Sequence, residues 1–308
     1  MCILHQVPSQ ANIERELRKI LFKKKVFCPW CGSYCIKKYE GRYRCKRCRK
    51  PFSLKSVCWL KGAKLSLRMI WLLLWCWCNK VPIDQTRKVC GLSEITVRRW
   101  FEKFRNHLPE EKLFKVRLSG IVQMDEFYRG GKKRGYSIIG AKQQKKSFKR
   151  KIVLQYLNKP SVDRKDVIDF LSQWIEPFTQ LQTDGSSVYK GISNWWPVKH
   201  LYEIHKKWEF TLTSEIEGLW GNFITFVRRM YHHITKDKLP SYLREFTARQ
   251  VYPEWFKNPQ SFLKISLPSL SEIVKEKEKS KKENSSTQKL VFSTPVLKNP
   301  LISVPKID

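Results

Sequence analysis

Three carboxylates carry the chemistry that the sequence predicts. Asp125 closes an apolar, strand-like stretch that begins at Gly120, Asp184 ends a second such stretch, and Glu217 lies inside a helical segment. Two acids at strand ends and a third on a helix supply the hard oxygen ligands of two divalent ions, which lie about 3.5–4 Å apart in phosphoryl-transfer sites. The pattern therefore predicts that these three side chains converge on a pair of metal ions.

Each acid also has an ordinary explanation. Asp125 could cap a strand end, with its neighbour Glu126 acting as the ligand instead. Asp184 precedes a glycine and could belong only to a turn. Glu217 could be a surface charge on its helix, with Glu215 as a competitor. The triad is favoured because the three acids occur together in this order and in strongly basic surroundings.

The charge balance indicates the substrate. Lysine and arginine total 61 against 27 acidic residues, which gives a formal net charge of +34. Such an excess repels itself unless a polyanion neutralises it, and the usual polyanion is nucleic acid, bound largely through its phosphates. Three cations just after the first acid are predicted to hold DNA phosphates, with a solvated loop as the alternative: Lys132, Lys133 and Arg134.

Size and hydrophobicity favour a folded protein that lies outside membranes. The 308 residues suffice for two or three compact units, and the 42% hydrophobic content with 12 tryptophans predicts packed cores. The most apolar segment, 69–78, is too short for a bilayer, which needs roughly 20 residues, and is interpreted as a buried helix. The N-terminus lacks the pattern of a secretory signal, so we expect an intracellular protein without a membrane partner.

Four of the ten cysteines have the spacing of a metal site. They form two Cys-x-x-Cys pairs separated by 13 residues: Cys28, Cys31, Cys45 and Cys48. Two such turns that face each other complete a tetrahedral site for structural Zn²⁺. The strand-like stretch 39–45 between them suits a zinc ribbon. Disulfides are disfavoured in a chain without an export signal, and Cys35 remains a substitute ligand.

A helical unit follows the predicted ribbon. Helices are expected at 65–79 and 84–90, and Gly91 then provides a turn. Ser93 is the predicted N-cap of a further helix, 94–104. This is the pattern of a helix-turn-helix, although an ordinary helical hairpin with a solvated basic face would look similar. The residues expected near DNA are Thr96, Arg98, Arg99 and Lys103.

The remainder has the element order of an α/β catalytic core. Strands are predicted at 121–124, 136–140, 151–157 and 179–183, and helices at 162–178 and 214–231. Three strands, a helix, a strand and a helix is the order of a ribonuclease-H-like core, a mixed sheet with flanking helices. The first of these helices is expected to bury Ile168, Leu171 and Ile175. The second would present Glu217 to two aspartates on neighbouring strands.

At these residues the chain resembles a known family, the ISXO-like DDE transposases, which are insertion-sequence relatives of the eukaryotic Merlin elements. The resemblance runs from Cys28 to about Arg249, with the ribbon and the helix-turn-helix in their expected places. Its motifs are the segments 125–132, 183–185 with Tyr189, 217–220, 231–232, and 242–246 with Arg249.

The resemblance implies a DNA transposase that uses Mg²⁺ or Mn²⁺. Asp125, Asp184 and Glu217 would bind the two ions, and the enzyme would nick element ends and join them to target DNA. The terminal repeats would be the specific substrate, bound by a homodimer or a larger synaptic complex. Some relatives rely on an Asn and a Lys at the positions where this chain has Ser214 and Ile224, and these replacements would disable that type of site. The Merlin-like relatives rely on the glutamate, so the resemblance implies that the site depends on Glu217.

The predicted organisation has five parts. They are an N-terminal segment at 1–22, a zinc ribbon at 23–58, a helix-turn-helix DNA-binding region at 59–110, a ribonuclease-H-like domain at 118–252, and an extension with a disordered basic tail at 253–308. The tail prediction rests on the charged, low-complexity segment 274–289. We expect the protein in the nucleus if the host is eukaryotic and otherwise with DNA in the cytoplasm.

Two functions from different classes remain open. The first is the transposase described above, and the second is a catalytically inactive, domesticated DNA-binding protein derived from one. A third class, a nuclease such as a resolvase, shares the metal chemistry, but the paired zinc and helix-turn-helix modules disfavour it.

Overall fold

The computed structural model describes residues 7–23, 25–39, 41–113, 115–129, 135–144, 150–203, 212–233, 235–267 and 269–270. The predicted DNA contacts Lys132, Lys133 and Arg134 and the predicted disordered segment 274–289 lie outside these ranges. The chain divides into two compact units, of which the first comprises Met1–Glu16 and Lys64–Ser266 and the second Leu17–Ala63 and Leu267–Asp308.

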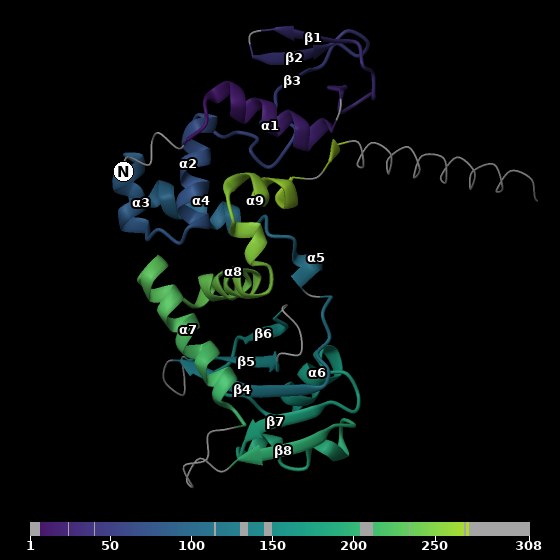
Figure 1. The fold of residues 1–308 in the computed structure, drawn as a ribbon, viewed down its shortest axis with the longest axis vertical. Coiled ribbons are helices and arrows are strands. Elements are labelled where there is room, and N and C mark those ends of the chain that lie inside the picture. Colours follow the sequence, from purple (N-terminus) through teal and green to yellow (C-terminus); the bar gives the residue numbers. More distant parts are fainter. Residues whose placement is uncertain are drawn as a thin grey trace, which may run out of the picture. The chain divides into compact units, whose positions relative to one another are not determined.

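A five-stranded mixed sheet forms the centre of the first unit. Its strands are β4 (Ile121–Arg129), β5 (Tyr136–Gln143), β6 (Ile152–Leu157), β7 (Gln180–Asp184) and β8 (Lys199–Glu203). They lie in the order β6-β5-β4-β7-β8 (Figure 1). β4, β5 and β6 are antiparallel neighbours, whereas β7 runs parallel to both β4 and β8. The fold is therefore α/β, as the sequence predicts.

The two faces of the central strand β4 serve different helices, because side chains alternate along a strand. Val122 and Met124 are fully buried with the apolar residues of α6 (Arg164–Trp174). On the opposite face, Gln123, Asp125 and Phe127 meet α7 (Ser214–Tyr231). One face of the sheet is thus mainly apolar core, and the other carries polar groups among aromatic rings.

Helix α6 is shorter than the sequence predicts. A capping box between Asp163 and Asp166 starts it, but it ends at Trp174 instead of continuing to Phe178. Ile175 is extended and forms a bridge with Leu118. Pro177 explains the early stop, because a proline disfavours helical geometry in the preceding residue and lacks an N–H. The prediction that α6 buries Ile168 was also wrong, since this residue is only half-buried.

Helix α7 begins and ends where the sequence predicts, at Ser214 and Tyr231. Its buried face contains the residues of the 3.6-residue apolar repeat together with two further aromatics. They are Ile216, Leu219, Trp220, Phe223, Phe226, Val227, Met230 and Tyr231.

Three helices precede the sheet in the chain: α2 (Leu67–Cys78), α3 (Ile83–Cys90) and α4 (Glu94–Arg105). Ser66 caps α2, and the Ser93 hydroxyl accepts a hydrogen bond from the Thr96 N–H at the start of α4. Between α3 and α4, Gly91 has a left-handed backbone with φ of 62°. Glycine adopts this conformation without steric cost, which gives α3 and α4 the order of a helix-turn-helix.

Three further α-helices and several 3-10 turns complete the first unit among the described residues. They are α5 (Glu110–Leu113), α8 (Leu239–Val251), α9 (Pro259–Ser266) and the 3-10 turns η2 (Ser187–Tyr189), η3 (Ile192–Asn194), η5 (Lys236–Lys238) and η6 (Pro253–Phe256). Trp77 of α2 is fully buried and packs against Phe104, Phe256 and Phe262. The helical region and the C-terminal helices therefore share one aromatic core.

The second unit contains a small three-stranded antiparallel sheet, formed by β1 (Ile36–Tyr39), β2 (Arg42–Cys45) and β3 (Pro51–Phe52). Tyr43 stacks on Phe52 with ring centroids 5.2 Å apart, and Phe27 meets Phe22 edge-on. Helix α1 (Gln10–Phe22), which the sequence analysis did not predict, is divided between the units. Within the described ranges, no helix is long and apolar enough to cross a membrane.

Candidate active site

A tryptophan on helix α7 orients the Asp125 carboxylate by a hydrogen bond. Its Oδ2 accepts a hydrogen bond of 3.0 Å from Nε1 of Trp220 on α7. Directly opposite Asp125 in the strand register lies Gly140 of β5. A Cβ at Gly140 would stand 2.5 Å from the Trp220 ring, so the indole can lie against the sheet only because this residue has no side chain. The ring of Phe127 packs against the same indole, with 5.4 Å between the ring centroids.

Gln123, two residues before Asp125, fixes the start of α7. Its Oε1 accepts hydrogen bonds from the backbone N–H groups of Glu215 and Ile216, at 2.9 and 3.0 Å. The Ile216 N–H also lies 3.1 Å from the Thr213 carbonyl, so the side chain from β4 acts as an additional cap on the first turn of the helix. Glu217 follows directly in this first turn, and its Oε1 accepts a hydrogen bond of 3.0 Å from the Thr213 hydroxyl.

Glu215, the competitor of Glu217, is engaged elsewhere. Its Oε2 pairs with Nζ of Lys142 on β5 at 2.8 Å, and its backbone carbonyl accepts a hydrogen bond from the same ammonium group. Because its charge is neutralised by the ammonium group of Lys142, Glu215 is the less suitable ligand for a metal ion.

Asp184 ends β7, the parallel neighbour of β4. The register pairs Gln123 with Gln182, so continuing by two residues brings Asp125 level with Asp184 on the same face of the sheet. The Asp184 Oδ1 accepts a hydrogen bond from the Ser186 N–H at 3.1 Å. The preceding residue, Thr183, is itself fixed by His200 of β8, with 2.9 Å between Oγ1 and Nε2.

The three acids influence one another electrostatically. Burial, together with the negative charges of Asp184 and Glu217, raises the pKa of Asp125 to about 6, while hydrogen bonds from the Glu126 backbone and Trp220 oppose the shift. Like charges that share a site disfavour ionisation. A bound divalent cation would relieve this repulsion.

The carboxylates do not form a single-ion cluster. Among the described residues, the four cysteines alone form a group of three or more ligands within 4.8 Å of one another. Ligands of one ion fall within such a distance, but a site with two ions about 3.5–4 Å apart spans roughly twice as much. The acids supply only hard oxygen donors on one face of the sheet, which fits Mg²⁺ or Mn²⁺.

Glu126 lies on the other face of β4 and faces Tyr189. Burial, with the negative charges of Asp125 and Asp184, raises its pKa to about 7. Within the part of the chain that the structure describes, its Oε1 and the Tyr189 hydroxyl are buried without a hydrogen-bond partner. Glu126 therefore remains an alternative ligand, although strand alternation directs it away from Glu217.

The four predicted zinc ligands lie together. The Sγ atoms of Cys28 and Cys48 are 3.5 Å apart, and those of Cys31 and Cys45 are 3.6 Å apart. The edge of a tetrahedral Zn–S₄ site is about 3.8 Å, so the cluster fits zinc. Cys35 is exposed and outside the cluster.

The electrostatics of the cysteine cluster also suit a cation. Backbone N–H groups, first that of Cys48, lower the pKa of Cys45 to about 6. Burial raises the pKa of Cys28 to about 12. A metal ion would offset that burial cost, because zinc binds the deprotonated thiolate.

The four predicted DNA contacts on α4 differ in their surroundings. Thr96 shares a hydrogen bond of 2.9 Å with Ser93, and Arg98 pairs with Glu94 at 2.7 Å. Lys103 lies over the Trp100 ring, 5.2 Å from its centroid. Arg99 is exposed, and so is Ile95, at 64%. The open surface of α4 thus centres on Arg99 and Ile95, and sequence reasoning overlooked the isoleucine.

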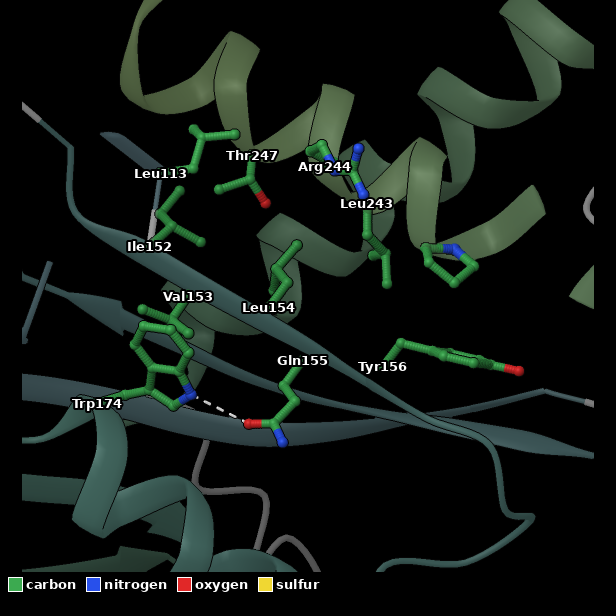
Figure 2. A pocket seen from close by; sticks show the side chains of 11 residues that line it. Leu113, Ile152, Val153, Leu154, Gln155, Tyr156, Trp174, Leu243, Arg244 and Thr247 are labelled. Atoms are coloured by element: carbon green, nitrogen blue, oxygen red, sulfur yellow. Dashed lines mark hydrogen bonds between the residues drawn. The ribbon is translucent and has the colours of Figure 1, made fainter. Parts of the chain in front are cut away.

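An apolar hollow of about 180 Å³ lies between β6 and α8 (Figure 2). Trp174 and Gln155 line one side and share a hydrogen bond of 3.0 Å, visible as the dashed line in Figure 2. Its single charged residue, Arg244, pairs with Glu110. No predicted site residue lines this hollow, and its apolar walls do not suit phosphoryl transfer.

Comparisons with known proteins identify the domain that carries the acids. Residues 117–250 match a family described as the ISXO2-like transposase domain. This stretch is an ISXO2-like transposase domain. The resemblance seen in the motifs is thereby confirmed, and all three acids of the proposed triad fall inside the matched range.

Other comparisons add little to the transposase domain. No curated protein matches the chain significantly. One solved structure that does match is a cryo-EM structure of a simian T-cell lymphotropic virus intasome in complex with PP2A regulatory subunit B56 gamma. Identity is 10%, coverage is 58% of this chain and 67% of that chain, and the TM-score is 0.32.

Sequence reasoning missed three residues that position the acids of the transposase domain, namely Gln123, Gly140 and Trp220. Trp220 was predicted only as part of a motif and of the apolar face of its helix, and Gly140 only as the end of a strand. An uncharged Gln inside an apolar strand was the one available signal for Gln123, since a buried amide needs a partner.

Proposed function

We propose that the chain is a DNA transposase that nicks element ends and joins them to target DNA. The proposed catalytic residues are Asp125, Asp184 and Glu217. The observation that carries the proposal is the position of Asp125, half-buried at the centre of the sheet, with its pKa raised by burial and by the charges of the other two acids.

The strand order supports a ribonuclease-H-like core. An antiparallel run of three strands is continued at its first strand by two parallel ones, and a long helix covers the face with the acids. In parallel neighbours, side chains at the ends of the strands meet at one edge. This topology accounts for the proximity of two aspartates that are far apart in the sequence.

Asp125, Asp184 and Glu217 would hold two divalent ions, either Mg²⁺ or Mn²⁺. When bound, such a pair activates a water or a DNA 3′-hydroxyl for in-line attack and stabilises the leaving oxygen. The chain's own part is to fix the carboxylates. Trp220 orients Asp125, Gln123 anchors the helix of Glu217, and the Ser186 N–H orients Asp184.

DNA binding in this proposal involves the other modules. The cysteine cluster would hold structural Zn²⁺, and α4 would approach DNA with Arg99 on its open surface. Thr96, Arg98 and Lys103 would also contact DNA, each giving up its present contact with Ser93, Glu94 or the Trp100 ring. Two element ends must be joined to one target, so we propose a homodimer or a larger synaptic complex.

The proposal is tested by incubating the full chain with Mg²⁺ and an oligonucleotide that carries the element's terminal repeats. We expect strand cleavage, and a loss of at least about 100-fold in Asp125→Asn, Asp184→Asn and Glu217→Gln. Glu215→Gln serves as the matched control and should retain cleavage, because Glu215 pairs with Lys142.

The same experiment distinguishes the alternatives. Binding to the repeats without cleavage under Mg²⁺ or Mn²⁺ would indicate a domesticated DNA-binding protein instead. If Glu126→Gln abolishes cleavage and Asp125→Asn retains it, the metal ligand on β4 is Glu126 and not Asp125.

A further inference from the structure

We propose that a hollow formed by Lys80, Arg150 and Arg229 binds phosphate groups of the DNA backbone. The hollow measures about 310 Å³ and includes none of the catalytic acids or predicted α4 contacts. This inference rests on the proposed function in one respect, since it takes DNA as the source of the phosphates. We call the site the cationic hollow.

Three distant segments bring these cations together. Lys80 follows α2, Arg150 precedes β6, and Arg229 lies in the last turn of α7. All three residues are exposed. The charged residues that line the hollow within the described chain are these three and Arg249, and no acid is among them.

Among the described residues that line the hollow, Arg249 at its base is the cation with an ion-pair partner. Arg249 is buried, pairs with Glu245 at 2.8 Å, and donates to the backbone carbonyls of Trp77 and Cys78. Lys80 sits above this arrangement, and burial together with the charges of Arg249 and Arg229 lowers its pKa. Cations placed together in this way repel one another, and an anion between them relieves that repulsion.

The neutral residues of the hollow are also suited to phosphate. Asn222, Thr225 and Gln250 line it, and side chains of these types commonly donate to phosphate oxygens. Arg150 donates a hydrogen bond to Oε1 of Gln250, which orients the guanidinium group. Arginine suits phosphate because its planar donors match the oxygens of the anion.

The position along α7 indicates which phosphates would be held. Arg229 lies twelve residues after Glu217 on the same helix, which corresponds to about 18 Å. For a duplex that runs along this helix, that distance corresponds to about five nucleotides at 3.4 Å each. The cationic hollow would therefore bind the DNA backbone next to the cleavage site, without sequence-specific contacts to the bases.

The test measures how the affinity for a duplex of arbitrary sequence depends on salt. The variant is Lys80→Asn combined with Arg150→Gln and Arg229→Gln, and asparagine is chosen because Lys80 has a left-handed backbone with φ of 56°. Each lost phosphate contact reduces the slope of log K against log salt by about 0.9. We expect the slope to become shallower by about 2–3 and the affinity to fall for every sequence alike.

A matched control removes the same charge from elsewhere. Arg164→Gln, Lys165→Gln and Lys190→Gln change three exposed cations that lie outside the hollow, and this combination should leave the slope within about 0.5 of the wild-type value. Thermal melting checks the fold of each variant. If the triple variant melts lower than the wild type, the three single variants replace it, each with an expected reduction of about 0.9.

Other outcomes would overturn the inference. A wild-type chain that binds duplex with a slope unaltered by the triple or single variants has no site for DNA phosphates here, although the transposase proposal then stands. A wild-type chain that fails to bind duplex at all defeats both. If inorganic phosphate at constant ionic strength raises the melting temperature while the slope for DNA is unchanged in the variants, the hollow is a site for free phosphate instead.

Discussion

At the scale of single residues, the Asp125 carboxylate depends on Trp220. The indole N–H is a donor to Asp125 Oδ2, and this hydrogen bond lowers the pKa of the aspartate against the larger effect of burial. A carboxylate held in one orientation is prepared to bind metal before DNA arrives. Trp220 is therefore a positioning residue, since it acts through Asp125.

We predict that Trp220→Phe reduces cleavage by roughly tenfold, the equivalent of about 1.4 kcal/mol. Because the variant loses a hydrogen bond to the charged form, the pKa of Asp125 rises, and the acid limb of the pH–rate profile should move to higher pH. Trp174→Phe is the control, because it removes a tryptophan hydrogen bond to Gln155 on the other face of the sheet. Equal effects of the two variants on the pH profile would contradict a specific role for Trp220.

Asp125 also affects stability in a predictable direction. Its folded-state pKa of about 6 exceeds that of an unfolded aspartate, about 3.9. Between these values the folded chain binds more protons, so stability falls as the pH rises and the penalty is complete above about pH 6.

We predict that Asp125→Asn, without added metal, raises the free energy of unfolding at pH 8 by on the order of 1 kcal/mol. At pH 4 the gain should be much smaller, since the aspartate is then protonated in the folded state and about half protonated in the unfolded state. Urea titrations at the two pH values measure the difference. The exposed Asp237→Asn is the matched control, and a similar gain at pH 8 in that variant would refute the explanation.

At the scale of elements, the site depends on how closely α7 approaches the sheet. Gly140 permits that approach, because the Trp220 ring occupies the space of its missing side chain. Two other glycines, Gly218 and Gly221, lie on α7 itself, where an added Cβ would meet nothing within 4 Å. The three glycines thus provide a direct comparison between a residue needed for packing and residues that are not.

We predict that Gly140→Ala lowers the free energy of unfolding by about 1–3 kcal/mol, because α7 must shift away from β5. Gly218→Ala and Gly221→Ala should instead raise it by about 0.5–1 kcal/mol each, since alanine is the better helix former. Chemical denaturation of the three variants measures this contrast. A neutral Gly140→Ala would mean that Trp220 does not lie against the sheet.

The elements that the sequence predicted correctly have local signals. Ser93 indicates a helix start because its hydroxyl can cap the first turn, and Gly91 indicates a turn because glycine tolerates a left-handed backbone. The apolar repeat of α7 extends along the whole helix. β8 was missed because Lys199–Glu203 is a largely polar edge strand. The end of α6 was misplaced because the apolar spacing continued through Ile175, beyond the point where Pro177 stops the helix.

The candidate site was predictable only in part, for a physical reason. The acids could be proposed from residue type and order, and two neighbouring strands of the expected core carry Asp125 and Asp184, each two residues beyond the last pair of their register, Gln123 with Gln182. The contacts of Gln123 and Trp220 join residues more than 90 positions apart. No local pattern encodes such contacts, because they depend on the packing of α7 across the sheet.

At the scale of the whole molecule, a buried charge network joins α7 to the helical region. The hydroxyl of Tyr231, the last residue of α7, donates to Glu245 of α8. The same carboxylate pairs with Arg249 and, at 3.7 Å, with Arg105 of α4. The helix that carries Glu217 and the helix predicted to contact DNA are therefore connected through one buried acid.

The second unit should depend on zinc. We predict one zinc ion per chain in the purified protein, lost in Cys31→Ser and retained in Cys35→Ser, because Cys35 lies outside the cluster. Mass spectrometry of the metal content measures this. We also expect the loss of zinc to weaken DNA binding while the five-stranded sheet, which belongs to the other unit, remains folded. Zinc-free wild-type protein would refute the assignment.

The most direct test of the account is to locate the catalytic metal ions. Crystals of the chain with Mn²⁺ and DNA, measured above and below the manganese edge, would separate manganese from zinc in the cysteine cluster. We predict two manganese peaks about 3.5–4 Å apart, bound by oxygens of Asp125, Asp184 and Glu217 at about 2.1 Å. Manganese bound through Glu126 or Glu215, with those three carboxylates left without metal, would contradict the account.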